Sequence, residues 1–550
     1  DRVLDHVALL AKSPRVHDTA ASRAALAYIE HAVGGERIPV GDVALPAIDV
    51  LGSHIRDAHV VHTDDPDLVL RFGPSGKALL LTAHYDTVPG SPGATDNAVA
   101  VGLLIELARE LRGHAPPFPV MLAFTADEEQ GLVGAEALAR DRDDIGFVIA
   151  LDLLGGDGAL VLNGASTLIG TAEMRWLADA ADRAGVIVRA PLPHRVVSRW
   201  WPAAERADHG AFTRRGIRAF HLYNRGNDGE WIDLAYHSAR DVPARLHRDS
   251  LAAAGRLVRA LTATPPPVHA GDGYWLPLAV NTVVPRWWLV AGELALVMIV
   301  IGALVLSRDG LVAMIARRHE RTRSAPDAPR GAGLLLGLLC YVVAAAIAIA
   351  VEHATAGEHP APWLHAPLRV LVADALVLAG AFGLATRVVA RFWPWRGDQR
   401  YLTFAAITCT AIGTLLVAIG AAELAWIWIV PAAAIALAPR LGRAGVLAVV
   451  IAALPVACML NPWQLREAAW HRFMPALPLA LWLAIVGAPT IATAAYYLRL
   501  RTRPSGPLGT LVLGMGCGLA VALGLVFAVT LDPPCTPAKF EEFHLACERV

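Results

Sequence analysis

Residues 78–86 read ALLLTAHYD, an apolar run of strand length that ends in a histidine, a tyrosine and an aspartate. Two further runs have the same form, because 120–129 (VMLAFTADEE) ends in acidic residues and 147–152 (FVIALD) ends in an aspartate. Between the first two lies 93–97 (GATDN), followed by a helical pattern over 98–111. Strands that alternate with helices predict an α/β domain with a mostly parallel central sheet flanked by helices. Such sheets carry their sites at the carboxyl ends of the strands.

The polar residues at these strand ends are of the types that bind metals. His84, Glu128, Glu129 and Asp152 follow apolar runs, and Asp96 precedes the helical pattern. Each has an ordinary explanation when taken alone: a histidine after a strand is usually structural, an aspartate caps a helix, and an acidic pair is solvated. Together they are harder to explain, since two adjacent acids after a buried strand cost desolvation unless a cation compensates. The sequence therefore predicts a metal site at this edge.

Five short motifs resemble those of one family, in the same order along the chain. They are His84-Tyr85-Asp86, Gly93-Ala94-Thr95-Asp96-Asn97, Asp127-Glu128-Glu129-Gln130-Gly131-Leu132, Leu151-Asp152-Leu153 and Tyr236-His237-Ser238. They look like the motifs of the di-zinc aminopeptidases of metallopeptidase family 28, over about residues 1–260. The resemblance implies the zinc exopeptidase fold and a metallo-aminopeptidase, an enzyme that hydrolyses the N-terminal bond of a peptide substrate.

The same resemblance implies two zinc ions and a role for each ligand. Asp96 would bridge the two ions, His84 and Asp152 would complete one site, and Glu129 and His237 would complete the other. A bridging carboxylate and a shared water or hydroxide suit two cations about 3.5–4 Å apart. Zinc itself is implied by the family, since a carboxylate-rich dinuclear site also accepts manganese or cobalt.

Further residues receive roles from the resemblance and from their positions. Glu128 would be the general base, which takes the proton of that water and passes it to the leaving amine. Asp86 would hold the second ring nitrogen of the preceding ligand histidine. Asp208 or His209 could contact the substrate or support the ligands, against ordinary hydrogen bonding within a loop. Tyr236 could line the pocket or stabilise the tetrahedral intermediate, against a packing role.

Two other functions stay open on the same residues. A glutaminyl-peptide cyclotransferase shares this fold and most of the motifs, and the stretch 208–216 is similar to one of its loops. Cyclases typically have tryptophan where this chain has Tyr236, and an insertion after the glutamate pair, whereas 129–135 (EQGLVGA) continues directly as in peptidases. A non-catalytic binding or receptor module would keep the fold and lose ligands. Because this chain has every ligand type and the base, we expect an aminopeptidase first.

The composition divides the chain into two parts. Of 550 residues, 55% are hydrophobic and 18% are charged, against about 45–50% and about 25% in soluble domains. The apolar excess lies in eight stretches of bilayer-spanning length, each of about 20 residues. The sequence therefore predicts a zinc peptidase domain over 1–262, a linker over 263–286, an all-α polytopic transmembrane bundle over 287–530 and a C-terminal tail over 531–550. This combination looks like the vacuolar and endoplasmic-reticulum membrane proteases of the same family.

The distribution of arginine sets the predicted orientation of the bundle. Arginines gather in alternate loops between the predicted spans, which places those loops in the cytoplasm. The peptidase domain and the tail then lie outside the cytoplasm, beyond the membrane of a bacterium or in the lumen of a eukaryotic compartment. On that oxidising side, Cys535 and Cys547 are expected to form a disulfide. Because the sequence begins at Asp1 without a signal, we expect a signal peptide or anchor to precede it.

The net charge excludes one class of partner. At −1, and with no basic stripe along the sequence, the chain has no feature that would attract nucleic acid. The expected partners are a peptide substrate, which the resemblance implies, and a lipid bilayer, which the predicted spans imply.

Overall fold

The computed structural model describes residues 1–48, 55–156, 159–163, 168–189, 207–224, 235–267, 273–275, 283–305, 331–356, 367–392, 399–419 and 422–437, with the isolated positions 451, 483–485, 487, 488 and 519. The chain divides into two compact units. The described residues of the first unit end at Arg286, and those of the second begin at Trp287.

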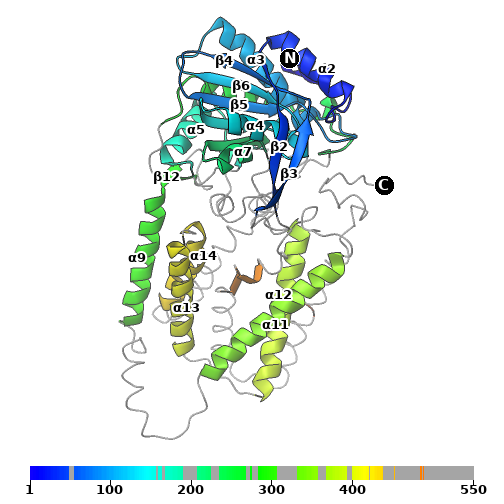
Figure 1. Cartoon of the computed structure of the whole chain (residues 1–550). Helices are drawn as coiled ribbons and strands as arrows, with labels where there is room; N and C mark the ends of the chain where they lie inside the picture. Colours follow the sequence, from blue (N-terminus) through cyan, green and yellow to red (C-terminus); the bar gives the residue numbers. More distant parts are fainter. Residues whose placement is uncertain are drawn as a thin grey trace. The chain divides into compact units, whose positions relative to one another are not determined.

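The first unit is built on an eight-stranded mixed sheet (Figure 1). In spatial order the strands are β1 (Glu36–Ile38), β4 (Asp67–Phe72), β6 (Val120–Thr125), β5 (Ala78–His84), β7 (Ile145–Leu151), β10 (Arg218–Asn224), β8 (Leu160–Asn163) and β9 (Val188–Arg189). The four central strands, from β6 to β10, run parallel, while β4 and β8 run antiparallel to them. The expected parallel sheet is therefore found at the centre, and the outer strands make the whole sheet mixed.

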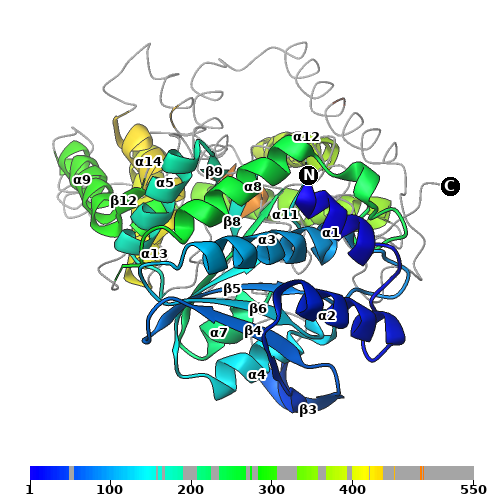
Figure 2. The same cartoon turned by 90° about the horizontal axis from the view of Figure 1, so that it is seen from above.

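Helices cover both faces of this sheet (Figure 2). One face carries α1 (Arg2–Leu10), α3 (Val99–Gly113), α5 (Thr171–Ala184) and α8 (Arg248–Leu261), and the other carries α4 (Val133–Asp141) and α7 (His209–Arg214). Leu79 and Leu81 of β5 belong to the first core, to which α2 (Ala20–Val33) also contributes, whereas Leu80 packs in the core of α4 and α7. Because successive strand residues face opposite sides, a strand covered on both sides is apolar throughout. This explains the continuous apolar runs before the candidate site.

Several short elements complete the first unit. β2 (Gly41–Ile48) and β3 (Ile55–Thr63) form one antiparallel pair, and β11 (Gly273–Trp275) and β12 (Val283–Pro285) form another. The second pair lies in the segment that was expected to be a linker. In the described loops there are three single turns: η1 (Ala94–Ala98), η2 (Glu128–Gln130) and η5 (Pro243–Arg245). The first two of these turns carry candidate ligands.

The second unit is helical in its described part. It comprises α9 (Arg286–Val305), α11 (Gly331–Ala356), α12 (Pro367–Phe392), α13 (Gln399–Ala418) and α14 (Ala422–Leu437). α13 and α14 share a core of small side chains, among them Ala406, Cys409 and Ala432.

The transmembrane bundle predicted over 287–530 is not borne out by these helices. Within the described ranges, no helix combines the length and the apolar character that crossing a bilayer requires. A crossing takes about 20 consecutive, predominantly apolar residues, whereas α14 has 16 residues in all and α12 includes the charged residues Arg369 and Asp374. The prediction of an all-α transmembrane bundle is therefore wrong for the described part of the chain.

Other parts of the same prediction concern residues that are not described. The last three predicted spans, over 444–530, lie outside the described residues apart from the isolated positions. The tail over 531–550, with Cys535 and Cys547, lies outside them entirely.

Candidate metal centre

The ligand types lie at one edge of the sheet because their strands run side by side in the same direction. β5 ends at His84, and its neighbours β6 and β7 end at the same edge. After β6 the chain turns into η2, which carries Glu128 and Glu129, and immediately after β7 comes Asp152. Residues that are up to 68 positions apart in sequence are thus brought together by strand order alone.

Asp96 reaches this edge from a loop of irregular backbone. It lies in η1, where Asp96 and Asn97 leave helical φ/ψ values and the peptide bond between them is cis. The side-chain amide of Asn97 donates to the carbonyl of Leu151 at 2.8 Å, which ties the loop to the end of β7. Gly93 precedes it with φ of 64°, and a Cβ at this position would collide with Thr87 and with the Asp96 carbonyl. Only glycine fits this turn without strain.

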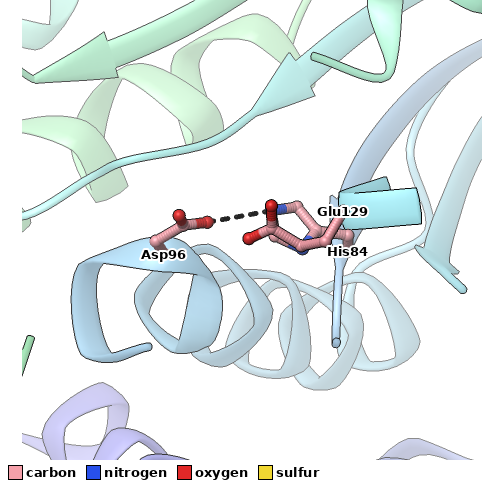
Figure 3. Close-up of side chains that lie close together, drawn as sticks. All are labelled: His84, Asp96 and Glu129. Carbon is pink, nitrogen blue, oxygen red and sulfur yellow. Dashed lines mark ion pairs between the residues drawn. The ribbon is translucent and has the colours of Figure 1, made fainter. Parts of the chain in front are cut away.

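The centre consists of two overlapping groups that share Asp96. Nε2 of His84 lies 3.1 Å from one oxygen of Asp96 and 3.4 Å from an oxygen of Asp152. Nε2 of His237 lies 3.1 Å from the other oxygen of Asp96 and 3.2 Å from an oxygen of Glu129. Figure 3 shows Asp96 and Glu129 pointing toward His84, and ligand atoms of these three residues lie within 4.8 Å of one another. The two carboxylate oxygens of Asp96 therefore face two different histidines.

The part of the chain that holds these residues matches a known protein family. Residues 67–262 match the family described as Peptidase family M28. All the candidate ligands lie inside the matched residues.

Individual relatives share only part of their length with this chain. A vacuolar membrane protease of Candida albicans is 37% identical over 87 residues, which cover 16% of this chain and 10% of the relative. Aminopeptidase YwaD of Bacillus subtilis is 27% identical over 193 residues, covering 33% of this chain and 39% of the relative. The chain thus spans about a tenth of the first relative and about two fifths of the second.

Solved structures of low sequence identity also align with this chain. A zinc-dependent exopeptidase from Parabacteroides distasonis has a TM-score of 0.40 and 21% identity, covering 48% of this chain and 98% of its own. A glutaminyl cyclase from Bacteroides thetaiotaomicron has a TM-score of 0.39 and 19% identity, covering 48% and 97%.

Burial and clustered charge together set the pKa values in the candidate centre. Burial, with the charges of neighbouring carboxylates, raises the pKa of Glu128, Glu129 and Asp152 above their usual values. Burial alone would lower the pKa of the histidines, but the surrounding carboxylates outweigh it. They raise the pKa of His84 well above its usual range and that of His237 to about 10. A buried group of acids this dense requires positive charge to balance it.

The donor set fits a divalent cation. Imidazole and carboxylate groups are ligands of zinc in proteins, and manganese and cobalt accept them too. Oε1 of Glu129 is buried and, among the described residues, has no hydrogen-bond partner. A buried polar atom without a partner is costly, and a cation beside this carboxylate would satisfy it.

Asp86 supports both His84 and the turn that follows β6. One oxygen of Asp86 lies 3.3 Å from Nδ1 of His84, the ring nitrogen opposite the one that faces Asp96. The same carboxylate accepts the backbone N–H groups of Glu128 and Glu129, each at 3.1 Å. The structure therefore places Asp86 beside the ring nitrogen of His84 that faces away from Asp96, and its carboxylate fixes the turn at Glu128 and Glu129.

Glu128 and Tyr236 lie next to the ligands in the chain. Glu128 opens η2 and is half-buried. The ring of Tyr236 stacks on the ring of His237, with the two centroids 3.7 Å apart. Burial raises the pKa of the Tyr236 hydroxyl well above its usual value, so this side chain stays a hydrogen-bond donor.

Asp208 and His209 contact residues of the central strands. The carboxylate of Asp208 accepts the hydroxyls of Thr82 and Thr125, at 2.8 and 2.6 Å, and so joins β5 to β6. The ring of His209 stacks on that of His221, with centroids 5.5 Å apart. These contacts tie Asp208 to β5 and β6 and His209 to His221 of β10.

Two charged residues of the candidate centre were not expected from the sequence. Asp241 is fully buried, and its carboxylate accepts the N–H and the hydroxyl of Thr95 and the N–H of Asp96. Arg15 is also buried and lies against Gly93. Neither residue lies at ligand spacing in the sequence, so no local signal could have indicated them.

Proposed function

We propose that the N-terminal unit is a zinc-dependent aminopeptidase. The observation that carries this proposal is the position of Asp96 between His84 and His237, with one further carboxylate beside each histidine. The match to Peptidase family M28 supports a peptidase. The similarity to Aminopeptidase YwaD supports cleavage at the amino end of the substrate.

Five residues would hold two divalent cations. His84, Asp96 and Asp152 would bind one ion, and Asp96, Glu129 and His237 would bind the other. When bound, such ions supply Lewis acidity and positive charge at the carbonyl group to be cleaved. The buried carboxylates would then ionise at a lower pH, because the ions balance their charge.

Glu128 would carry the proton. Water attacks the carbonyl carbon of the first peptide bond, and Glu128 accepts a proton from that water. As the C–N bond breaks, Glu128 passes the proton to the nitrogen of the leaving peptide. The backbone N–H of Glu128 donates to Asp86 at 3.1 Å, which fixes the turn from which this carboxyl group projects.

A substrate panel on the purified full chain tests the proposal. Aminoacyl amides report on aminopeptidase activity, and peptides with N-terminal glutamine report on cyclisation, each with and without a chelator. We expect hydrolysis of the amides that is lost on chelation and restored by zinc. Ring closure without hydrolysis would favour a glutaminyl cyclotransferase, and no turnover of either substrate would favour a binding module.

A single variant separates the base from the ligands. Glu128→Gln should retain the bound metal and lose about 10²–10⁴-fold in kcat, since the proton acceptor is removed while every ligand stays. Glu110→Gln is the matched control, because Glu110 is an α3 residue whose carboxylate pairs with Arg259. Metal content and kcat are measured on the same samples. A Glu128→Gln variant with near wild-type turnover would show that the assigned base is wrong.

A further inference from the structure

The loop between α1 and α2 buries an arginine beside the candidate centre. Arg15 is 2% exposed, and each hydrogen bond described for its guanidinium goes to a backbone carbonyl. Nε donates to Tyr85 at 2.7 Å, Nη1 to Leu10 at 2.8 Å and to Pro92 at 2.7 Å, and Nη2 to Gly93 at 3.1 Å. A planar fork of five N–H groups suits several acceptors at once.

Three of the four carbonyls that accept from Arg15 belong to two loops that carry candidate ligands, and the fourth, that of Leu10, lies at the end of α1. Tyr85 is flanked by His84 and Asp86. Gly93 lies three residues before Asp96, and a Cβ on Gly93 would approach Nη2 of the arginine to 2.9 Å. Backbone contacts reinforce the first attachment, because the N–H of Arg15 donates to the Thr87 hydroxyl at 2.8 Å and the Thr87 N–H donates back to its carbonyl at 3.2 Å.

Two residues further on, His17 contacts a third ligand loop. Its Nδ1 lies 2.8 Å from an oxygen of Asp127, whose side chain is fully buried. Asp127 directly precedes Glu128 and Glu129, and its backbone φ of 53° places it in the left-handed region. A side-chain contact at this point holds the turn that leads from β6 to the acidic pair.

The loop that presents these side chains is itself fixed. Asp65 is 1% exposed, and its carboxylate accepts the N–H of Asp18 at 3.2 Å and the Ser22 hydroxyl at 2.7 Å. The Thr19 hydroxyl caps α2 by accepting the N–H of Ser22 at 3.2 Å. The loop therefore has a defined conformation from which Arg15 and His17 can act.

We infer that Arg15 and His17 are positioning residues that hold the three ligand-bearing loops of the candidate metal centre in register. The inference rests on the proposed metal-dependent function. Burial lowers the pKa of Arg15 to about 10, so the side chain remains a cation at neutral pH. Both residues precede the segment 67–262 that matches the M28 family, so the centre depends on a part of the chain outside that match.

Metal affinity of the full chain, rather than activity alone, tests the inference. Zinc affinity is measured by competition with a chelator of known affinity, and ligand geometry by the visible spectrum of the protein loaded with Co²⁺. Arg15→Met removes the planar guanidinium group and its charge, whereas Arg15→Lys keeps the positive charge and loses the planar set of N–H donors. We expect Arg15→Met to lose about 10–100-fold in zinc affinity, the range for residues that support ligands. Arg15→Lys and His17→Leu should show smaller losses, with altered Co²⁺ spectra.

Matched controls separate positioning from general stability. Arg218→Met removes a guanidinium that pairs with the buried Glu173 at 2.6 Å and donates to the carbonyls of Pro267 and Gly146. Arg218 lies at the start of β10, the strand end opposite the site. His62→Leu removes an exposed histidine that pairs with Asp42 at 2.7 Å. Both should keep wild-type zinc affinity and spectra.

The outcomes distinguish failure of the positioning inference from failure of the proposed function. A folded Arg15→Met protein with wild-type affinity and spectrum would overturn the inference. If Arg15→Met does not fold, wild-type values in both Arg15→Lys and His17→Leu would overturn it. A wild-type chain that binds zinc yet cleaves no peptide would refute the proposed function and leave the positioning roles standing.

Discussion

Replacing Asp241 with asparagine should loosen the loop that carries the shared ligand. One oxygen of Asp241 accepts the N–H and the hydroxyl of Thr95, at 2.8 and 2.7 Å, and the other accepts the N–H of Asp96 at 3.1 Å. An asparagine has one acceptor oxygen and one NH₂ group. If the oxygen stays with the two donors of Thr95, the NH₂ group faces the Asp96 N–H, and a buried donor loses its partner.

The size of the effect follows from that one lost acceptor. A buried donor left without a partner costs about 1–3 kcal/mol, which corresponds to roughly 5–150-fold faster exchange of the amide hydrogens in this loop. Hydrogen exchange followed by mass spectrometry on the full chain, in peptides that cover η1, measures this directly. Asp144→Asn is the control, because Asp144 pairs with Arg71 and Arg142 at the surface. Unchanged exchange in η1, with unchanged zinc affinity, would refute the role assigned to Asp241.

Two further expectations test the site and the surface. Asp96→Ala should remove both metal ions together, since both groups of ligands share this carboxylate, whereas Asp152→Ala should weaken mainly the binding of one ion. Elemental analysis of the purified variants would count the bound ions. Equal loss of metal in the two variants would contradict a shared ligand. The hydrogen bond to Asp42 raises the pKa of His62 above 6.5, so the pair stabilises the fold below pH 6.5 and this contribution is lost as the pH rises through the raised pKa. An NMR titration should show the pKa of His62 returning toward 6.5 in Asp42→Asn, and no change would argue against the pairing.

The strand ends of the candidate centre could be predicted because their signals are local. Each apolar run and the polar residue that ends it lie within ten residues of sequence, as in 78–86. Parallel strand order then brings His84 and Asp152 to one edge without further information. His237 could be named only through its motif, because it lies in a loop beyond the last strand of the sheet.

The supporting residues could not be predicted, because their contacts join distant segments. Arg15 and Tyr85 are 70 positions apart, and Asp241 and Thr95 are 146 apart. A single arginine before a helix, or an aspartate after a histidine, carries no local pattern that identifies its partner. Hydropathy had a different weakness over 287–530, because it counts apolar residues along the sequence rather than within one helix. Among the described residues of this region, no helix combines the length and the apolar character that a crossing requires.

The supporting residues share one physical task. They form hydrogen bonds with backbone groups of loops, which have no neighbouring strand to pair with. Backbone N–H groups near the ligands donate to Asp86 and Asp241, while backbone carbonyls accept from Arg15 and Asn97. Buried backbone groups need such partners, and charged side chains make stronger hydrogen bonds than neutral ones. Acids therefore hold the N–H groups, and a buried guanidinium and an amide hold the carbonyls. Apart from the bonds of Arg15 to Leu10 and Pro92, each of these hydrogen bonds lies within three residues of a candidate ligand. A site fixed in this way is preorganised by its own loops, so that ion binding need not order them.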